Sequence, residues 1–253
     1  MVNAVILAGS DLSKAGTEYE YKALIRLNDR YMIEYVLDAV TQARYINRVV
    51  VIGPKELLTS ELLPNEKYTK VEFIDQDLSI MKNAKKAIEY LNENLKVMFL
   101  TCDIPFITSE AVDKFIEQSM QSGADICYPI VEKKVNDTKY PEMKRTYGTV
   151  KEGTFTGGNV VLVNPAIFDK CYEVAEKLVE KRKNPIAMAR IIGPTILLLF
   201  LTKKLSIKRV EKRVSKVFKI KAKAIISTYP EIGQDVDKES DLKAANQYFN
   251  KRD

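Results

Sequence analysis

The sequence feature that most constrains the fold is the apolar run at the N-terminus, Asn3-Ala-Val-Ile-Leu-Ala8, which ends at Gly9. A continuous apolar run of this length is typical of a strand that is buried on both faces of a parallel sheet. Ligands of such sheets bind beyond the carboxyl ends of the strands. We therefore expect the polar loop from Gly9 to Lys22 to lie at a binding site.

Strand-like and helix-like segments alternate along the rest of the chain. Further strands are predicted at 48–52, 71–74, 96–100, 124–130, 160–163 and 220–226, with a hairpin around 151–153. Helices are predicted around 33–40, at 79–91, 108–122, 166–183 and 185–217, the last broken near Gly193-Pro194, and in the tail after Asp235. This order predicts a three-layer α/β/α sandwich with a mostly parallel, mixed sheet. We expect a single domain over 1–253, with a basic helical segment at about 177–223.

Composition excludes several kinds of catalytic site. The chain has no histidine, which rules out Ser-His-Asp and Cys-His catalysis, histidine-ligated zinc and a histidine general base. The three cysteines, Cys102, Cys127 and Cys171, are far apart and odd in number, so we expect small core residues rather than disulfides or a zinc site. The N-terminus does not resemble a signal peptide, and the longest apolar run, 196–201, is too short to span a membrane. A reducing cytoplasm is the expected location.

The positive charge is concentrated in one segment. The whole chain carries +6, but 177–223 holds 15 Lys and Arg against two Glu, a local charge of +13. A solvated helical face that covers the core is the favoured interpretation. Peripheral membrane contact through 196–213, a partner-binding helix and the steering of anionic substrates are the alternatives. No nucleic-acid partner is expected, because no aromatic residues are interleaved with the charges. Homo-oligomerisation stays open.

Two groups of carboxylates stand where a metal could bind. Asp103 directly follows the predicted strand at 96–100, at the carboxyl edge of the sheet, and Mg²⁺ is commonly held by one or two carboxylates together with substrate phosphates. Asp235 and Asp237 alternate, so in an extended segment they would point to the same side. The competing interpretation is that these residues only cap turns and the last helix.

The loop after the first strand has the composition of a phosphate-binding turn. Gly9 would allow backbone N–H groups to approach an anion, and Lys22 or Lys14 would supply positive charge. An ordinary strand-to-helix turn is the alternative. The loop has neither the GxxxxGK[ST] pattern nor the GxGxxG pattern, which disfavours P-loop and Rossmann folds.

Taken together, several motifs in one order resemble the MobA-like nucleotidyltransferases, the family of molybdenum-cofactor guanylyltransferase. They are Ala4-Val-Ile-Leu-Ala-Gly9 with Lys22-Ala-Leu, Met32-Ile-Glu-Tyr-Val, Thr101-Cys-Asp-Ile-Pro-Phe, Thr156-Gly-Gly-Asn159 and Asp235-Val-Asp-Lys-Glu-Ser-Asp-Leu242. The resemblance implies a nucleotide-diphospho-sugar transferase (GT-A-like) fold. It also implies transfer of a nucleoside monophosphate from an NTP to a small phosphorylated acceptor, with release of pyrophosphate.

The resemblance also assigns roles by position. Lys22 and Asp103 would be catalytic, and Asp103 with Asp237, or Asp235 in its place, would hold Mg²⁺. The nucleotide would bind at Leu7, Ala8, Gly9, Ser10, Lys14 and Lys22. Gly157, Gly158 and Asn159 would line the acceptor pocket, although a β-bulge at a strand start explains these two glycines equally well.

The glycine loop departs from the family pattern LAGGxGxRxxxxPK. The segment from Ser10 to Lys14 lacks the second and third glycines and the arginine, and Tyr21 replaces the proline before Lys22. This departure motivates one alternative, a non-catalytic nucleotide-binding or regulatory relative. A second alternative is a GT-A-type glycosyltransferase, because Asp235-Val-Asp237 matches a DxD metal motif.

Overall fold

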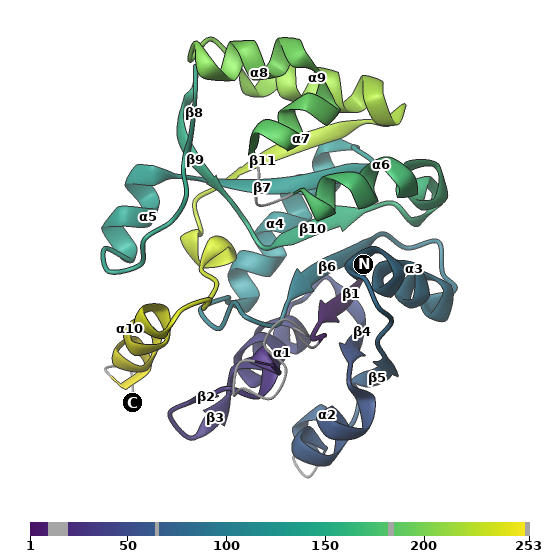
Figure 1. Cartoon of the computed structure of the whole chain (residues 1–253). Coiled ribbons are helices and arrows are strands. Elements are labelled where there is room, and N and C mark those ends of the chain that lie inside the picture. The colour runs from purple at the N-terminus through teal and green to yellow at the C-terminus, as the bar shows by residue number, and fades with distance from the viewer. Residues whose placement is uncertain (10–19, 64–65, 182–184, 251–253) are drawn as a thin grey trace.

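The computed structural model describes residues 1–9, 20–63, 66–181 and 185–250 (Figure 1). Within these residues the main sheet has the strand order β5-β4-β1-β6-β10-β7-β9-β8, and β11 pairs with β7. The strands are β1 Val2–Leu7, β4 Ile46–Gly53, β5 Glu72–Asp75, β6 Val97–Thr101, β7 Ile126–Glu132, β8 Gly148–Val150, β9 Gly153–Gly157, β10 Val160–Val163 and β11 Ala222–Ser227. A separate small hairpin joins β2 (Arg26–Leu27) to β3 (Arg30–Tyr31).

The first strand is the centre of a parallel half-sheet, as its apolar sequence predicts. Val5 of β1 pairs with Val50 of β4 on one side and with Phe99 of β6 on the other, both in parallel register. Strand β10 enters antiparallel beside β6, and β7 returns antiparallel to β10. The sheet is therefore mixed but mostly parallel, and the carboxyl ends of β1 and β6 lie at one edge.

Helices cover both faces of this sheet and form two layers. On one face, alternate residues of β1 such as Ala4 and Ile6 pack against helices α1 (Met32–Gln42), α2 (Lys55–Leu62) and α4 (Ser109–Ser122). On the other face, Val5 packs among residues of α3 (Ile80–Leu91) and α6 (Phe168–Glu180). The side chains of Ala4, Val5 and Ile6 have no exposed surface, which confirms burial on both faces.

Local signals set several helix ends as expected. The Ser79 hydroxyl accepts a hydrogen bond from the Lys82 backbone N–H at 3.2 Å and begins α3. The Thr108 hydroxyl plays the same part for α4, and Gly123 ends α4 with φ +58°, in the left-handed region that glycine favours.

The structure also contains elements that periodicity does not predict. Helix α2, helix α5 (Lys133–Lys139) and the β2–β3 hairpin are short, so they carry too few residues for a clear apolar pattern. The region expected as one helix with a break at Gly193 is three helices, α7 (Pro185–Ile192), α8 (Pro194–Leu201) and α9 (Ile207–Phe218). The second break follows Thr202, where Lys203 adopts φ +55°.

The C-terminal helix brings the acidic tail back to the start of the chain. Helix α10 (Glu239–Asn250) packs through Ala245 and Tyr248 on a small core that contains Leu27 and Phe106. The rings of Phe106 and Tyr248 meet edge to face with centroids 5.0 Å apart. This packing fixes the segment before α10 next to the carboxyl ends of β1 and β6.

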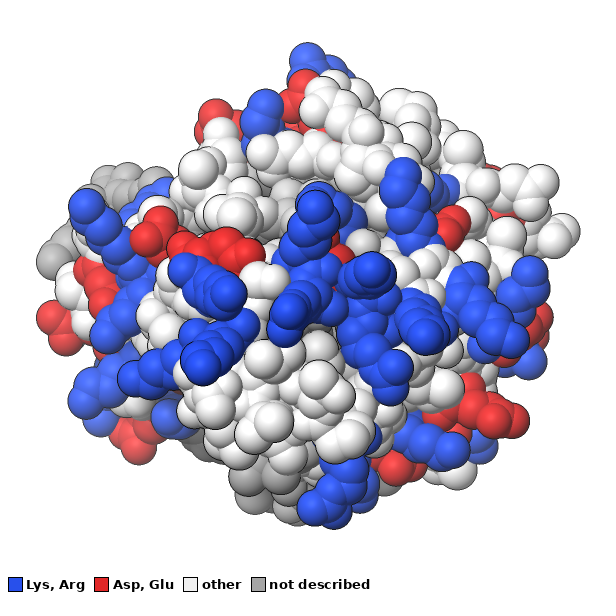
Figure 2. All heavy atoms as spheres, turned by 90° about the horizontal axis from the view of Figure 1, so that it is seen from above, with Lys and Arg blue, Asp and Glu red and all other residues white. Residues whose placement is uncertain are grey.

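The basic segment forms the helical surface at the top of Figure 1. Figure 2, which looks down on this surface, shows mainly Lys and Arg among the charged side chains at its middle. No helix among the described residues combines the length and the apolar character needed to cross a bilayer.

Candidate functional site

Three carboxylates meet at the carboxyl edge of the sheet. Asp103 follows β6, and its backbone carbonyl accepts a hydrogen bond of 2.8 Å from the N–H of Val236. That bond aligns the extended segment before α10, so Asp235 and Asp237 both turn toward Asp103. Each of the three carboxylates offers an oxygen within 4.8 Å of the other two. The expected same-side placement of Asp235 and Asp237 is confirmed.

Lys22 lies between two of these carboxylates. Its ammonium Nζ is 3.0 Å from Asp103 Oδ2 and also pairs with Asp237 Oδ1. Burial alone lowers the pKa of Lys22, but the charge of Asp103 and the hydrogen bond with Asp237 outweigh it and raise the pKa above its usual range. The lysine is therefore positively charged at neutral pH. The short 3-10 helix Lys22–Leu24 at the end of the loop holds it in this place.

The third carboxylate sits in a different environment. The Asp235 carboxylate pairs with Arg145, whose side chain is only 9% exposed. Burial, together with the negative charges of Asp103 and Asp237, raises the pKa of Asp235 to about 6, against the lowering effect of Arg145. The cluster thus holds three carboxylates against two cationic side chains and keeps a net negative charge.

These residues fit a hard divalent cation. Carboxylate oxygens are the ligands that Mg²⁺ and similar ions prefer. Asp103 Oδ1 is buried and has no hydrogen-bond partner among the described residues, and Thr101 Oγ1 at the same edge is in the same state. Buried polar atoms are normally satisfied, so two of them beside a carboxylate cluster indicate a missing polar ligand.

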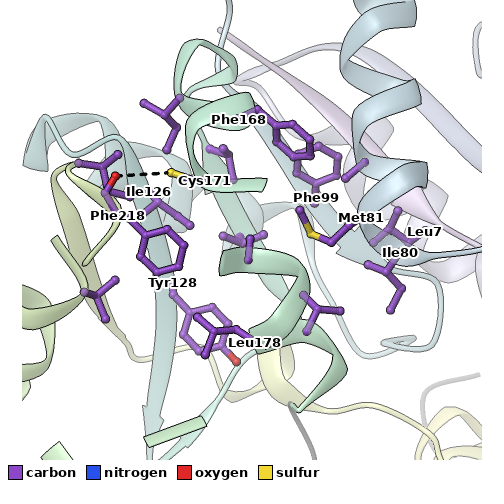
Figure 3. Close-up of a pocket in the computed structure, with 18 residues that line it drawn as sticks. Leu7, Ile80, Met81, Phe99, Ile126, Tyr128, Phe168, Cys171, Leu178 and Phe218 are labelled. Carbon is purple, nitrogen blue, oxygen red and sulfur yellow. Dashed lines mark hydrogen bonds between the residues drawn. The ribbon is translucent and has the colours of Figure 1, made fainter. Parts of the chain in front are cut away.

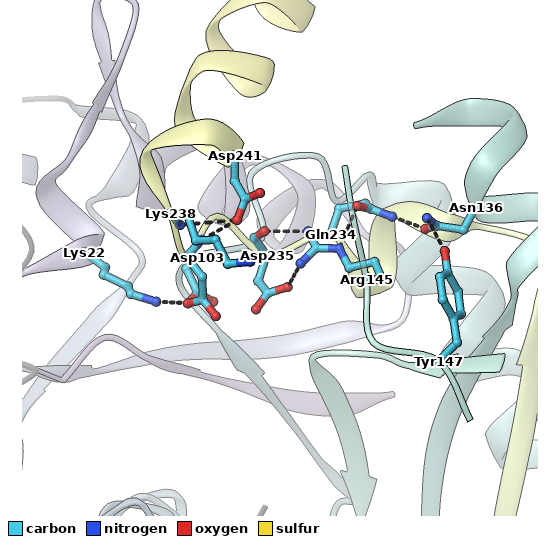
Figure 4. A network of polar contacts seen from close by, with 10 residues as sticks. Lys22, Asp103, Asn136, Arg145, Tyr147, Gln234, Asp235, Lys238 and Asp241 are labelled. Carbon is cyan, nitrogen blue, oxygen red and sulfur yellow. Dashed lines mark hydrogen bonds and ion pairs between the residues drawn. The ribbon is translucent and has the colours of Figure 1, made fainter. Parts of the chain in front are cut away.

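A hydrogen-bonded chain of polar side chains begins at Asp235 and runs away from Asp103 (Figure 4). Arg145 donates from Nε to Gln234 Oε1 at 3.0 Å, and from its terminal nitrogens to the carboxylate and the backbone carbonyl of Asp235. The Gln234 amide donates to Asn136 Oδ1, and Asn136 donates to the Tyr147 hydroxyl at 3.0 Å. Gln234 and Asn136 are fully buried.

Sequence reasoning did not single out Arg145, Asn136 or Tyr147. They lie in the charged, turn-rich stretch 131–156, which gives no sign of which residues face the site. Arg145 and Asp235 are 90 residues apart in the chain, so only their contact in the folded structure identifies the pair.

Asp241 fixes the other end of the acidic segment. Its carboxylate Oδ2 accepts hydrogen bonds of 3.2 Å from the backbone N–H groups of Asp237 and Lys238. The residue therefore holds the turn that presents Asp237, at the N-terminal end of α10, and it does not belong to the carboxylate cluster.

A polar cleft of about 400 Å³ lies beside the cluster. Its lining includes Gly157, Gly158 and Asn159 together with the acidic Asp235 and Asp237, and the basic side chains of Lys144, Arg145 and Lys238. The two glycines lie close against neighbouring side chains: a Cβ on Gly158 would lie 2.7 Å from Pro129 Cγ, and one on Gly157 would collide with the Tyr128 hydroxyl. These glycines are needed for packing, and they also bring the strand edge to the cleft.

The structure describes some of the positions that the resemblance predicts to bind nucleotide. Leu7 pairs with Thr101 at the end of β1, Ala8 is buried, and Gly9 is exposed where β1 ends. Gly53 lets this turn come close, because a Cβ there would lie 2.5 Å from the Ala8 carbonyl oxygen. Ser10 and Lys14 lie outside the described residues, so their predicted contacts stay predictions.

Comparison with known proteins agrees with this architecture. The family model of the MobA-like NTP transferase domain matches residues 4–192. A solved structure described as a hypothetical transferase from Thermus thermophilus is 33% identical, with a TM-score of 0.81 over 96% of this chain and 100% of that chain. A CMP:2-keto-3-deoxy-manno-octonic acid synthetase complexed with CTP is 10% identical, with a TM-score of 0.66 over 99% of both chains, and shows a shared fold.

A sequence relative matches a shorter part of its own length. The bifunctional protein GlmU of Thermodesulfovibrio yellowstonii is 26% identical over 196 residues, which is 72% of this chain but 41% of that protein. The chain therefore spans less than half of this relative. The structural neighbours confirm the predicted α/β fold of the nucleotide-diphospho-sugar transferase type.

Proposed function

Because this chain belongs to the MobA-like NTP transferase family, we propose that it transfers a nucleoside monophosphate from an NTP to a small phosphorylated acceptor and releases pyrophosphate. The observation that carries the proposal is the meeting of Lys22, Asp103 and Asp237 at the carboxyl edge of the sheet. Residues far apart in sequence supply a charged lysine and a carboxylate cluster at the place where α/β sheets bind ligands.

Such a transfer depends mainly on positioning and on neutralising negative charge, so it needs no histidine. Lys22 would bind the NTP phosphates, exchanging its carboxylate partners for phosphate oxygens. Asp103 and Asp237, with Asp235 as a further ligand, would hold Mg²⁺, which when bound neutralises phosphate charge. Arg145 would keep Asp235 in place, and Asp241 would hold the turn that carries Asp237.

The acceptor would occupy the polar cleft. Lys144, Arg145 and Lys238 line it beside the acidic Asp235, Asp237 and Asp241. These basic side chains would attract an anionic acceptor, and Asn159 would provide an amide to a hydroxyl or phosphate. Gly157 and Gly158 would let the acceptor approach the backbone. The acceptor phosphate would then lie next to the carboxylate cluster where the NTP phosphates bind.

Equilibrium binding of each of the four NTPs with Mg²⁺ tests the first half of the proposal. We expect at least one NTP to bind, and Asp103→Ala to weaken that binding at least about tenfold, because the metal loses a ligand. The exposed Asp29→Ala is the matched control and should leave binding unchanged. Absence of binding to all four NTPs would overturn the proposal.

Pyrophosphate release with a panel of phosphorylated acceptors tests the second half. NTP binding without release for any acceptor would support a non-catalytic nucleotide-binding relative instead. Binding of nucleotide-diphospho-sugars with release of a nucleoside diphosphate would support a glycosyltransferase. In both cases the three carboxylates would keep their role in binding; the first protein would transfer no group, and the second would transfer a sugar.

A further inference from the structure

An apolar cavity of about 370 Å³ lies between the sheet and helices α3, α6 and α9. Figure 3 shows Phe99 and Ile126 from the sheet, and Phe168 and Cys171 from α6, among the side chains that line it. None of the described residues that line it is charged. The volume falls in the range of small-molecule binding sites, which are lined mainly by hydrophobic side chains.

The few polar groups at this cavity are already paired. The Tyr128 hydroxyl donates a hydrogen bond of 2.8 Å to the Gly158 carbonyl. The Cys171 thiol donates to the Phe218 carbonyl, with an S···O distance of 3.9 Å. Water needs two to four polar partners to be held in a cavity, and apolar cavities of about 150 Å³ stay dry and take up hydrocarbons. The chemistry of the lining therefore matches a hydrocarbon group.

The cavity adjoins the polar cleft of the candidate site. Tyr128 lines both the apolar cavity and the polar cleft, and it lies at one end of the cavity in Figure 3. The absence of a side chain at Gly157 makes room for the Tyr128 hydroxyl. A ligand that passes this tyrosine would place a polar head beside Arg145 and an apolar tail in the cavity.

Helix α9 connects the cavity to the basic surface. Its Val214 and Phe218 line the cavity, whereas its Lys208, Lys212 and Lys216 side chains are exposed. In the preceding helix α8, Leu198 and Leu201 are 63% and 64% exposed. Figure 2 shows the basic side chains gathered on this face. Basic residues with exposed leucines are the composition of a surface that meets anionic lipid.

We propose that the acceptor is a phosphorylated amphiphile, with its phosphate in the polar cleft and a single hydrocarbon chain in the apolar cavity. The inference deepens the proposed function and rests on it, because the acceptor role of the cleft is part of that proposal. The amphiphile reaches the protein either from a bilayer or as a free molecule, and both sources present the same phosphate and chain.

Calorimetric titration with decyl phosphate and ethyl phosphate, below the micelle concentration and with Mg²⁺ present, tests the inference. Each buried methylene adds to binding, so decyl phosphate should bind at least about tenfold more tightly than ethyl phosphate, with hexyl phosphate between them. Equal binding of the three phosphates would overturn the inference.

Cavity-filling variants locate the chain. Ala175→Trp and Val179→Trp place a ring in the cavity from α6 and should reduce the decyl-to-ethyl preference to no more than about threefold. Lys177→Trp, on the exposed side of the same helix, is the matched control and should keep the preference. If both tryptophan variants fold and still prefer decyl phosphate, the assignment of the chain to this cavity is contradicted. If neither variant folds, the ethyl, hexyl and decyl phosphate series on the wild type tests the inference.

NTP binding measured in the same samples separates the two proposals. NTP binding without chain preference overturns the inference alone. Chain preference without NTP binding overturns the proposed function, and the acceptor role with it, while the cavity remains a chain-binding site.

Co-sedimentation with vesicles distinguishes the sources of the amphiphile. A bilayer source predicts that the protein is retained on vesicles of phosphatidylglycerol and phosphatidylcholine but not on vesicles of phosphatidylcholine alone. It also predicts that the double variant Leu198→Glu/Leu201→Glu loses this retention. Chain preference with no retention on anionic vesicles would identify a free amphiphile.

Discussion

Lys22 Nζ lies 3.0 Å from Asp103 Oδ2, although 81 residues separate the two along the chain. The pair joins the end of the N-terminal loop to the end of β6, and Asp237 completes it from the C-terminal segment. A cation in this position offsets part of the negative charge of the carboxylates. The same cation and a divalent metal therefore compete for these carboxylates, which leads to the first prediction.

Lys22→Met should separate metal binding from nucleotide binding. Removal of the ammonium group takes away the cation that pairs with Asp103 and Asp237, so Mn²⁺ should bind the ligand-free variant more tightly than it binds the wild type. The variant should nevertheless lose about 100-fold in kcat/KM for the proposed transfer, because the positive charge that would contact the NTP phosphates is removed. Calorimetry with Mn²⁺ and a pyrophosphate assay measure the two effects.

The exposed Lys70→Met serves as the control and should change neither quantity. Weaker Mn²⁺ binding in Lys22→Met would show that the lysine organises the carboxylates rather than competing for them.

Arg145→Met should destabilise the fold through its partner. The substitution leaves the Asp235 carboxylate buried without its cation, and breaking such pairs costs about 3–5 kcal/mol when both partners are fully buried. Because Asp235 is 22% exposed, we expect about 2–3 kcal/mol, measured by urea unfolding at pH 7. The double variant Arg145→Met/Asp235→Asn should recover part of the loss, since the uncompensated charge is removed. No recovery would mean that Gln234 and the Asp235 carbonyl, not the carboxylate, account for the effect of Arg145.

Gly158→Ala and Gly9→Ala should differ in what they damage. A Cβ at residue 158 lies 2.7 Å from Pro129 Cγ in a packed strand edge, so overpacking should cost about 1–3 kcal/mol of unfolding free energy. A Cβ at residue 9 lies 3.0 Å from the terminal oxygen of Gln76, a side chain that can move, so stability should change little. Under the proposed function, Gly9→Ala should instead weaken NTP binding. Equal loss of stability in the two variants would contradict this distinction.

Asp38 should make stability pH-dependent in the acid range. Burial alone raises the pKa of Asp38, but the side chains of Lys67, Arg30 and Tyr68 outweigh it and lower the pKa below its ordinary value. A group with a lowered folded pKa stabilises fully above its unfolded pKa of about 3.9 and loses that contribution as the pH falls through the folded pKa. Asp38→Asn should therefore cost about 1–3 kcal/mol at pH 7 and progressively less below about pH 4.

Urea unfolding of the wild type and Asp38→Asn at pH 7 and pH 3 measures this change. The exposed Asp29→Asn should show no such pH-dependent difference. A difference between wild type and Asp38→Asn that is the same at both pH values would rule out ionisation of Asp38 as its cause.

Local sequence determined much of the architecture, because its signals act over a few residues. The apolar run of β1 requires burial on both faces, and the Ser79 and Thr108 hydroxyls satisfy the first free N–H groups of α3 and α4. The placement of Asp103 after β6 also followed, since parallel strands end at one edge of a sheet. Composition and spacing also marked Lys22 and the Asp235–Asp237 pair as candidates, and the family resemblance added roles to them; the structure brings them to the same place.

Tertiary structure alone decided the rest of the site. Arg145 supports Asp235 only because the segment after α5 folds over the tail, and no local pattern encodes a contact across 90 residues. Tyr128 reads in the sequence as an ordinary strand residue, yet packing places it between an apolar cavity and a polar cleft. Hydrophobic periodicity specifies which face of an element is buried, but it does not specify which distant side chain or hollow that face will meet. That choice depends on how the layers pack together.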